Sequence, residues 1–450
     1  MEGSASLSVG TLRYSREQLL SVFFWMLWGD LCVNVMETII PRLVPLHLER
    51  LKASSFVMGL VIGVPSFVEL IINPFVSTWS DRFRSRFGRR RPFILLGTPL
   101  LAGCLMLVGL ADPIGRGFGF LSHLGLSQNA ITIIALAVLL AIFQIFNVIV
   151  LATYYYLIAD VVPNPVIGTF TSLYKVMGAL GGIVFNQYIF KYADAYEFRI
   201  YVGCALLYLV SFLLMGWQVK EGQYPPPAPR PEQAKGVAQS IGHWCMESFS
   251  IRFYQKLYLI GLCFYFALGG VLFTQFLALN DLHMTKQDFG SATAQAGLFA
   301  LPFFFVLGPL ADKFHPIRVG MVGMACMAIS GLVCFFFIHD PKSFYIFTVV
   351  NTIATTVYLG GQISLLPRIL PRSHYGQYCS ANNTLCAIGK FGAPALCGLA
   401  IDLLHLNRFA YLWQAGFALA GVGAFALVLQ HWKRLGGDTN YAPPTYAART

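Results

Sequence analysis

Residues 80–94 read SDRFRSRFGRRRPFI, and the fold can be worked out from this stretch. It holds six arginines within ten residues, and apolar runs at 55–79 and 93–110 lie on either side of it. An apolar run of about 20 residues is long enough to cross the hydrocarbon layer of a membrane as a helix. Arginines concentrate in the short cytoplasmic loops of membrane proteins. The stretch therefore predicts a tight cytoplasmic turn between two membrane-spanning helices.

The composition of the whole chain is that of a membrane protein. Of its 450 residues, 56% are hydrophobic and 11% are charged, whereas soluble proteins have about 25% charged residues. The net charge of +11 lies in short segments between apolar runs, so it does not form the basic surface of a nucleic-acid-binding protein. Composition thus excludes a soluble enzyme, a disordered chain and a nucleic-acid binder.

The apolar runs predict an all-α membrane protein with twelve transmembrane helices. They cover 17–45, 55–79, 93–110, 130–158, 168–190, 200–219, 254–278, 290–310, 318–338, 343–366, 376–402 and 409–430. Lysine and arginine number 19 in the connections on the side of the N-terminus and 8 in the others. This asymmetry predicts a multi-pass protein of the cell membrane with both termini in the cytoplasm.

Two pairs of motifs recur in the two halves of the chain. Asp81 follows the second span as Asp312 follows the eighth, and Gly168 opens the fifth span as Gly376 opens the eleventh. Corresponding helices of like polarity indicate a parallel repeat.

The repeat predicts two bundles of six helices. The expected domains are an N-terminal bundle at 1–219, a cytoplasmic linker at 220–253, a C-terminal bundle at 254–430 and a cytoplasmic tail at 431–450. The linker contains the proline-rich residues 224–231, which cannot be helical, and then a stretch at 237–253 that predicts a short helix on the membrane surface.

Ionisable side chains inside the spans are costly, so each one marks a cavity or a partner. Asp30, Asn34 and Glu37 have the spacing i, i+4, i+7 and share one helical face. Carboxyl groups at this depth can take up and release a proton. We therefore expect proton coupling to involve Asp30 and Glu37, together with Glu69 and Lys175. The alternative is a structural network in which Lys175 pairs with an acid.

Neutral amides occur on several of the predicted spans, and as a set they indicate a polar cavity. Amides donate and accept hydrogen bonds, and beside aromatic rings such as Trp25, Trp28 and those at 154–156 they suit a neutral, polyhydroxylated ligand. The alternative is hydrogen bonding between helices, worth about 0.6 kcal/mol per contact. The expected substrate-binding residues are Asn34, Gln144, Asn147, Gln275, Gln295, Asn351, Gln362, Asn382 and Asn383.

The stretch at 80–94 resembles the loop signature of the plant and animal sucrose carriers and their bacterial relatives. More broadly, it is similar to the glycoside–cation symporters of the major facilitator superfamily. Asp30-Leu-Cys32 with Glu37 resembles the acidic first helix of the sucrose carriers, and 370–377 resembles their segment before the eleventh helix. The resemblance implies the major facilitator fold, with two pseudo-symmetric six-helix bundles. One difference is that 147–156 lacks the arginine that sucrose carriers usually have near the end of the fourth helix.

The resemblance also implies a gate, because in that family the loop acid lies near the start of the eleventh helix and helps to close the cytoplasmic side. An acid is favourable there, since a helix N-terminus carries about half a positive charge. The alternative is a loop that only anchors the orientation of the chain. The expected gating residues are Asp81, Arg82, Gly88, Arg89, Arg90, Asp312 and Lys313.

These features predict a secondary transporter, not an enzyme. It would move a small polar solute, a disaccharide or a glucoside, by proton-coupled symport and alternating access. The alternatives are a sodium-coupled glycoside symporter of the melibiose type, a metabolite or drug exporter, and a membrane enzyme or receptor without transport. No CxxC pair, P-loop, Gly-x-Ser-x-Gly or HExxH motif occurs, so we expect no metal and no cofactor. The expected partners are a sugar, protons or sodium ions and the lipid bilayer, for a monomer that binds no nucleic acid.

Overall fold

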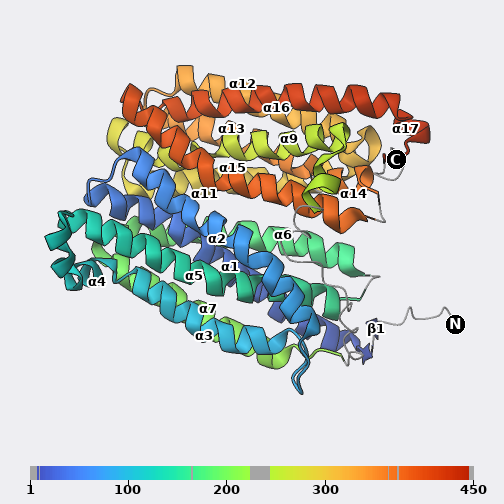
Figure 1. Ribbon diagram of the computed structural model, residues 1–450, viewed down its shortest axis with the longest axis horizontal. Coiled ribbons are helices and arrows are strands. Elements are labelled where there is room, and N and C mark those ends of the chain that lie inside the picture. The colour runs from blue at the N-terminus through green and yellow to red at the C-terminus, as the bar shows by residue number, and fades with distance from the viewer. Residues whose placement is uncertain are drawn as a thin grey trace. The chain divides into compact units, whose positions relative to one another are not determined.

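Helices make up nearly all of the protein in the computed structural model, which describes residues 8–9, 11–163, 166–222, 244–362, 364–371 and 374–444. Within these ranges, a helical segment forms at each of the twelve predicted spans, so the prediction of an all-α membrane fold is confirmed (Figure 1). The segments begin with α1 (Arg16–Arg50), α2 (Ser55–Arg82), α3 (Arg91–Val108), α5 (Gln128–Val161), α6 (Ile167–Val184) and α7 (Ala193–Gln218). They continue with α9 (Arg252–Leu268), α11 (Lys286–Phe314), α12 (Pro316–Phe337), α13 (Pro341–Gln362), α15 (Tyr375–Leu404) and α16 (Phe409–Arg434). Eleven helical stretches are long and apolar enough to cross a membrane, because the fifth and sixth segments run on as one, Leu173–Gln218.

The starts of these helices follow from local sequence. Ser15 caps α1 by accepting a bond from the Gln18 backbone N–H, while the Gln18 side chain accepts one from the Ser15 N–H. Thr285 and Asp288 form the same reciprocal box before α11. Such boxes satisfy two of the backbone donors that a helix start leaves unpaired.

Two of the segments are interrupted by wider and tighter turns. α6 runs into the π-helix η3 (Phe185–Ile189) and the 3-10 turn η4 (Phe190–Tyr192). α9 is followed by the 3-10 turn η5 (Val271–Phe273), the single turn α10 (Thr274–Phe276) and the π-helix η6 (Leu277–Asp281). π-turns inside α-helices are frequent at functional sites.

Several small elements lie in connections where the sequence predicted only loops. They are the hairpin β1 (Ser8–Val9) and β2 (Leu12–Arg13), α4 (Ala111–Gly117), the 3-10 helix η1 (Gly119–Leu124), α14 (Leu365–Ile369) and α17 (Gly437–Asn440). Of the surface helix predicted at 237–253, residues 244–249 are helical, and the part before 244 lies outside the described residues.

The chain divides into two compact units. The first unit comprises Met1–Ala53 and Val64–Pro229, and the second comprises Ser54–Gly63 and Arg230–Thr450. In the first unit, α1 packs against α6 and α7, while α3 packs against α5 and α7. In the second, α12 packs against α13 and α16, and α9 packs against α15 and α16. α2 therefore begins in the second unit and ends in the first, and the domain limits expected from the sequence remain a prediction.

The first turns of α2 fit closely against α15 within the second unit. The Asp402 carboxylate accepts bonds from the backbone N–H groups of Ser55 and Phe56, at 2.8 and 2.9 Å. A Cβ at Gly59 would lie 2.2 Å from the Pro394 carbonyl oxygen. Only glycine allows this approach, and Asp402 satisfies the donors at the start of α2.

The described residues beyond α16, up to 444, fold back onto the second unit. The Tyr441 hydroxyl donates to the Ile369 carbonyl, and the Tyr254 hydroxyl donates to the Pro444 carbonyl, both at 2.8 Å. The Arg318 guanidinium pairs with Asp438 at 2.6 Å. Three parts of this unit, α9, α12 and α14, are thereby joined to the segment 435–444, which we call the C-terminal strap.

Candidate functional site

The Asp30 side chain is completely buried where α1 meets α6. α6 comes this close because it presents glycines. A Cβ at Gly178 would lie 3.2 Å from Asp30 Oδ2, and one at Gly181 would lie 2.7 Å from the Leu31 carbonyl oxygen. Asn34 Nδ2 donates to the Asp30 carbonyl at 2.9 Å and to Asp30 Oδ1 at 3.2 Å. The side chain of Asn34 thus holds the carboxyl group in place.

Asp30 has no basic partner among the described residues. Its charged neighbour is another acid, Glu37, and the Tyr174 hydroxyl lies against the carboxyl group. Lys175 is half-buried on α6 and forms no ion pair with Asp30. A carboxylate buried without a counter-charge is costly, so a bound proton or cation stabilises it.

Tyrosines surround this carboxyl group on two helices. Tyr154 is buried, and its hydroxyl donates to a carbonyl of α1 at 2.6 Å. The neighbouring Tyr155 is 42% exposed, with its ring centroid 6.2 Å from that of Tyr174. Glu37 and Glu69 both lie near enough to Tyr155 to interact with it electrostatically. Of the aromatic rings expected to meet a ligand, Tyr155 offers the most exposed one.

Two of the expected ligand-binding amides lie on α5 in the first unit. Gln144 and Asn147 are both buried, and Asn147 Nδ2 donates to Gln144 Oε1 at 3.4 Å. Asn147 Oδ1 accepts no hydrogen bond from the described residues. Asn147 Oδ1 can therefore accept a hydrogen bond from a further partner.

The second unit uses some of the expected amides to connect its helices. Asn351 Oδ1 accepts from Ser330 at 2.8 Å and from Gln414 at 2.6 Å, which joins α13 to α12 and α16. Asn382 Nδ2 lies 3.6 Å from the Cys386 sulfur on the same helix. The remaining amides range from buried to exposed: Gln275 is buried, Gln295 and Gln362 are partly buried, and Asn383 is exposed.

The arginine-rich turn is built around a carboxylate. Gly88 has a φ of +106°, which favours glycine, and the chain after it enters α3. Glu221 lies beyond α7 and accepts bonds from the backbone N–H groups of Arg89, Arg90 and Arg91, at 2.9, 2.9 and 2.7 Å. Its side chain thus satisfies the donors at the start of α3.

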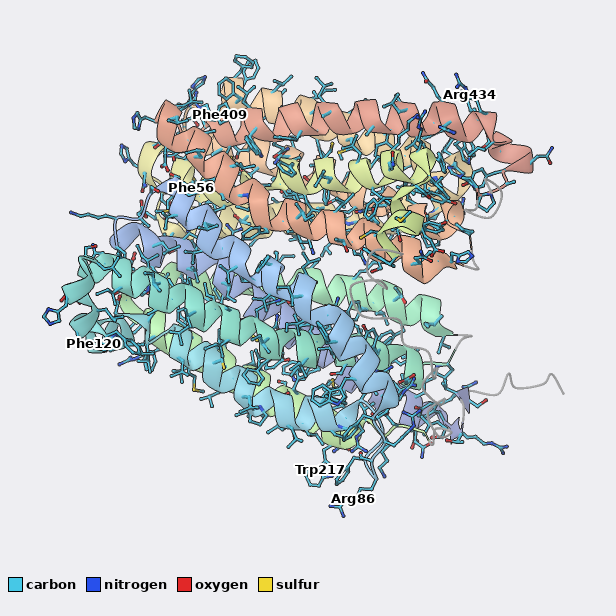
Figure 2. All side chains as sticks on the ribbon, in the orientation of Figure 1. Phe56, Arg86, Phe120, Trp217, Phe409 and Arg434 are labelled. Atoms are coloured by element: carbon cyan, nitrogen blue, oxygen red, sulfur yellow. The ribbon has the colours of Figure 1, made fainter. Side chains whose placement is uncertain are left out.

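The arginine side chains of this turn reach neighbouring helices. Arg89 makes two bonds to the Asp160 carboxylate near the end of α5, at 3.1 and 2.6 Å. Arg90 donates to Ser80, and its guanidinium lies 4.8 Å from the centroid of the Tyr156 ring. The turn therefore ties α2, α3, α5 and α7 together at one end of the first unit. Figure 2 shows Arg86 and Trp217 at this end and Phe120 at the other.

The gate predicted from the sequence falls partly on side chains outside the described residues. The side chains of Asp81, Arg82 and Asp312 lie outside the described residues. Lys313 is exposed, with its ammonium group 5.2 Å from the centroid of the Phe314 ring. The gate stays a prediction from the sequence.

Sequence reasoning missed the two acids that organise the arginine-rich turn. Glu221 and Asp160 directly follow the apolar runs at 200–219 and 130–158. Both runs end on the side where the six arginines were expected. The position of these two acids was the signal that could have identified them. A cluster of arginines needs counter-charges nearby, and both acids lie on the same side of the membrane as the arginines.

A family model described as "MFS/sugar transport protein" matches residues 26–372 of this chain. Among curated proteins, the sucrose transport protein SUC3 of Arabidopsis thaliana is 42% identical over 50 residues, which are 11% of this chain and 8% of that protein. The sucrose transport protein SUT4 of Oryza sativa subsp. indica is 34% identical over 81 residues, or 16% and 14% of the two chains. The matches therefore span only a small part of these relatives.

Solved transporters share the fold over nearly the whole chain. A bacterial homologue of the human lysosomal transporter Spinster, in an inward-facing and occupied conformation, has a TM-score of 0.70 at 14% identity and covers 97% of this chain and 100% of its own. A D-xylose–proton symporter has a TM-score of 0.63 at 16% identity, covering 92% and 96%. At such low identity these likenesses establish the fold alone.

Proposed function

The chain belongs to the MFS/sugar transport protein family, and on that basis we propose that it carries a disaccharide or glucoside across a membrane by proton-coupled symport and alternating access. The family and its structural relatives are multi-pass membrane transporters, not enzymes. The local identity to sucrose transport proteins supports a sugar as the substrate.

The observation that carries the coupling proposal is Asp30. It is buried in the first unit, held by Asn34 and without a basic partner among the described residues. Binding a proton there removes the cost of the unpaired charge. Glu37 and Glu69 supply further acids near Tyr155, and Lys175 adds a base on α6.

The proposed sugar contacts are Asn34 and the Tyr155 ring in the first unit, with the amides Gln144, Asn147, Gln275, Gln295, Asn351, Gln362, Asn382 and Asn383. An amide can both donate to and accept from sugar hydroxyls. Asn147 Oδ1 has no bond among the described residues, which favours it over Asn351, whose oxygen already accepts two.

Uptake into proteoliposomes tests the proposal. With a panel of mono- and disaccharides, a pH gradient should drive accumulation of at least one sugar, and a sodium gradient at constant pH should not. Accumulation driven by sodium alone would support the melibiose-type alternative instead. No uptake of any sugar under either gradient would reject the proposed substrate class.

The Asp30→Asn and Glu37→Gln variants test the coupling residues. Each should lose accumulation against a gradient while retaining exchange of sugar, because coupling needs a titrating group and exchange does not. Asp340→Asn, at an exposed acid before α13, is the matched control and should accumulate sugar normally. Undiminished accumulation in both test variants would assign these acids to structure.

A further inference from the structure

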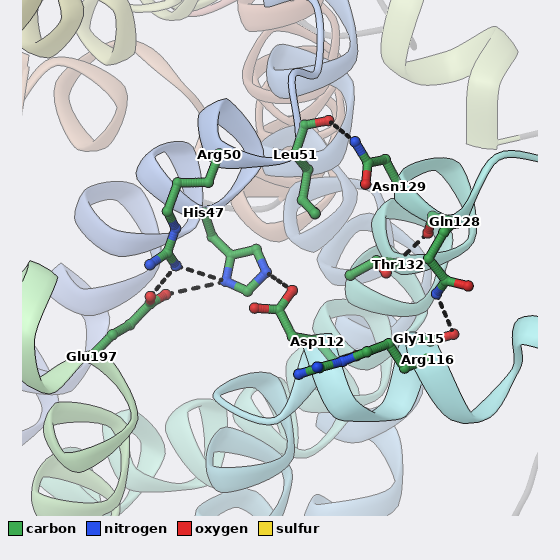
Figure 3. A network of polar contacts seen from close by, with 10 residues as sticks. All are labelled: His47, Arg50, Leu51, Asp112, Gly115, Arg116, Gln128, Asn129, Thr132 and Glu197. Atoms are coloured by element: carbon green, nitrogen blue, oxygen red, sulfur yellow. Dashed lines mark hydrogen bonds and ion pairs between the residues drawn. The ribbon is translucent and has the colours of Figure 1, made fainter.

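A second group of titratable side chains lies far from Asp30, at the other end of α1. His47 is in the last turn of α1, 17 residues after Asp30, which places it roughly 25 Å away along the helix. It is 5% exposed. Figure 3 shows its imidazole between two carboxylates that come from different helices. The proposed transport function does not use this group.

Both ring nitrogens of His47 face an acid. Nε2 lies 3.0 Å from Asp112 Oδ1 on α4, and Nδ1 lies 3.2 Å from Glu197 Oε1 on α7. A carboxylate only accepts hydrogen bonds, and a neutral imidazole has a single N–H to donate. The two contacts are both satisfied only when the ring carries two protons.

The count of charges in the cluster favours the same state, whereas one contact opposes it. Arg50 pairs with Glu197, and its guanidinium nitrogen lies 3.3 Å from His47 Nδ1, which could accept from it only while carrying no proton. With a neutral ring, the two carboxylates would share only this one cation. Adding a proton to His47 balances two negative with two positive charges around a buried ring, although the Asp112 and Arg50 side chains are themselves 48% and 50% exposed.

The helices around His47 carry few further titratable groups near the ring. α4 also holds Arg116, an exposed residue whose Nε points back to the Asp112 carbonyl at 3.5 Å. α7 adds Tyr201, buried beside Glu197. At the start of α5, the polar residues of this network are the uncharged Gln128, Asn129 and Thr132 (Figure 3).

Residues of α5 contact both α4 and the end of α1. Gln128 Nε2 donates to the Gly115 carbonyl at 2.9 Å, and a Cβ at Gly115 would lie 2.4 Å from Thr132 Oγ1. Asn129 Nδ2 donates to the Leu51 carbonyl at 3.1 Å. These uncharged contacts hold α4 and the end of α1 around the imidazole in either protonation state of His47.

We propose that His47 is a proton-binding site of this protein, separate from Asp30, and that its loaded form holds α4 and α7 against the end of α1. When the proton leaves, one ring nitrogen presents a lone pair to a carboxylate. Glu197 is 17% exposed and keeps both Arg50 and the remaining ring proton, whereas Asp112 is 48% exposed and can be hydrated. Asp112 is therefore the acid that is released, and α4 loosens. By the orientation expected from the lysine and arginine distribution, this end faces away from the cytoplasm and responds to the outer pH.

Nitrogen-15 NMR of histidine-labelled protein in nanodiscs tests the proposal directly, because it reports how many ring nitrogens of His47 are protonated. The His47 signals, assigned by their loss in His47→Gln, should show two protonated nitrogens at pH 6 and one at higher pH. A single protonated nitrogen at every pH from 5 to 9, the range around the ordinary imidazole pKa of about 6.5, would overturn the proposal.

A cysteine reporter tests the consequence for α4. Ala111, buried beside Asp112, becomes the single cysteine in a background without native cysteines, and its labelling rate is compared with that of a cysteine at the exposed position of His123. Over the pH range in which only the closed form holds the His47 proton, the normalised rate should rise by up to about tenfold per pH unit, because opening releases one proton. At higher pH both forms have lost the proton, and the rate should level off.

Three variants separate protonation from structure. His47→Gln and the milder Asp112→Asn should both make the normalised rate independent of pH, since neither retains the charged pair. Asn129→Ala removes an uncharged contact of the same cluster and should raise the rate while keeping its pH dependence. An unchanged pH dependence in Asp112→Asn, or its loss in Asn129→Ala, would contradict the proposal. No sugar is needed, so failure here leaves the proposed transport function untouched.

Discussion

Tyr154 and Tyr155 are neighbours in sequence with opposite surroundings. Tyr154 is buried and bonded to a carbonyl of α1, whereas Tyr155 exposes its ring near Asp30 and Tyr174. A residue's position on the helix face, rather than its type, decides whether it packs or meets a ligand. The pair therefore allows packing and binding to be tested side by side.

Replacing Tyr155 with alanine should raise the half-saturating sugar concentration about two- to tenfold, because an aromatic contact is worth about 0.5–1.5 kcal/mol beyond its buried area. Tyr154→Phe should instead lower the free energy of unfolding by about 0.5–1.5 kcal/mol through its lost hydrogen bond, without changing sugar affinity. Transport kinetics and thermal unfolding measure the two effects. Equal sugar affinity in Tyr155→Ala and the parent would remove Tyr155 from the proposed site.

At the scale of elements, the contact between α1 and α6 depends on glycines, because a larger residue would not fit between the two helices. Gly181→Ala would bring a Cβ to 2.7 Å from the Leu31 carbonyl, and backbone atoms cannot rotate away. Overpacking of this kind costs about 1–3 kcal/mol. Gly103 on α3 has nothing within 4 Å of its added Cβ, so Gly103→Ala should stabilise the protein by up to about 1 kcal/mol through helix propensity. Unfolding measured in detergent should move in opposite directions for the two variants.

The start of α3 depends on Glu221. Glu221→Ala should lower the free energy of unfolding by about 1–2 kcal/mol, since three backbone donors lose a charged acceptor at a helix N-terminus. Glu221→Gln should cost less, because the amide oxygen can still accept a bond. Glu17→Gln, in the exposed first turn of α1, controls for the loss of an acid near a helix start. A similar cost for Glu17→Gln and Glu221→Ala would refute the special role of Glu221.

For the whole molecule, the gate remains the main prediction. Asp81→Asn and Asp312→Asn should favour the inward-open state, since each removes an acid expected at the start of a helix in the other half of the repeat. Two such contacts, each worth about 0.3–2 kcal/mol, shift the equilibrium about tenfold or more when their sum exceeds 1.4 kcal/mol. A cysteine in the inner cavity, in a background without the ten native cysteines, should then react faster with an impermeant reagent from the cytoplasmic side. Equal rates in mutant and parent would leave the loop as an orientation anchor.

The sequence predicted the number and place of the long helices because a membrane sets the length of each apolar run. It also predicted the face shared by Asp30, Asn34 and Glu37, since spacing along one helix fixes a face. It could not predict that Gly178 lies against Asp30, because that depends on which helices pair. Nor could it predict that Glu221 caps the turn at Arg89, 132 residues earlier in the chain.

The C-terminal strap has a consequence for how the protein is made. Tyr254 opens α9 early in the second unit, and its partner Pro444 is 190 residues further along the chain. At roughly 5–20 residues per second, a ribosome reaches that partner about 10–40 s after Tyr254 has emerged. Until then α9, α12 and α14 are inserted without the segment that joins them. The nascent second unit is therefore open to chaperones and proteases through most of its synthesis, and closure of the strap marks the moment when that exposure ends.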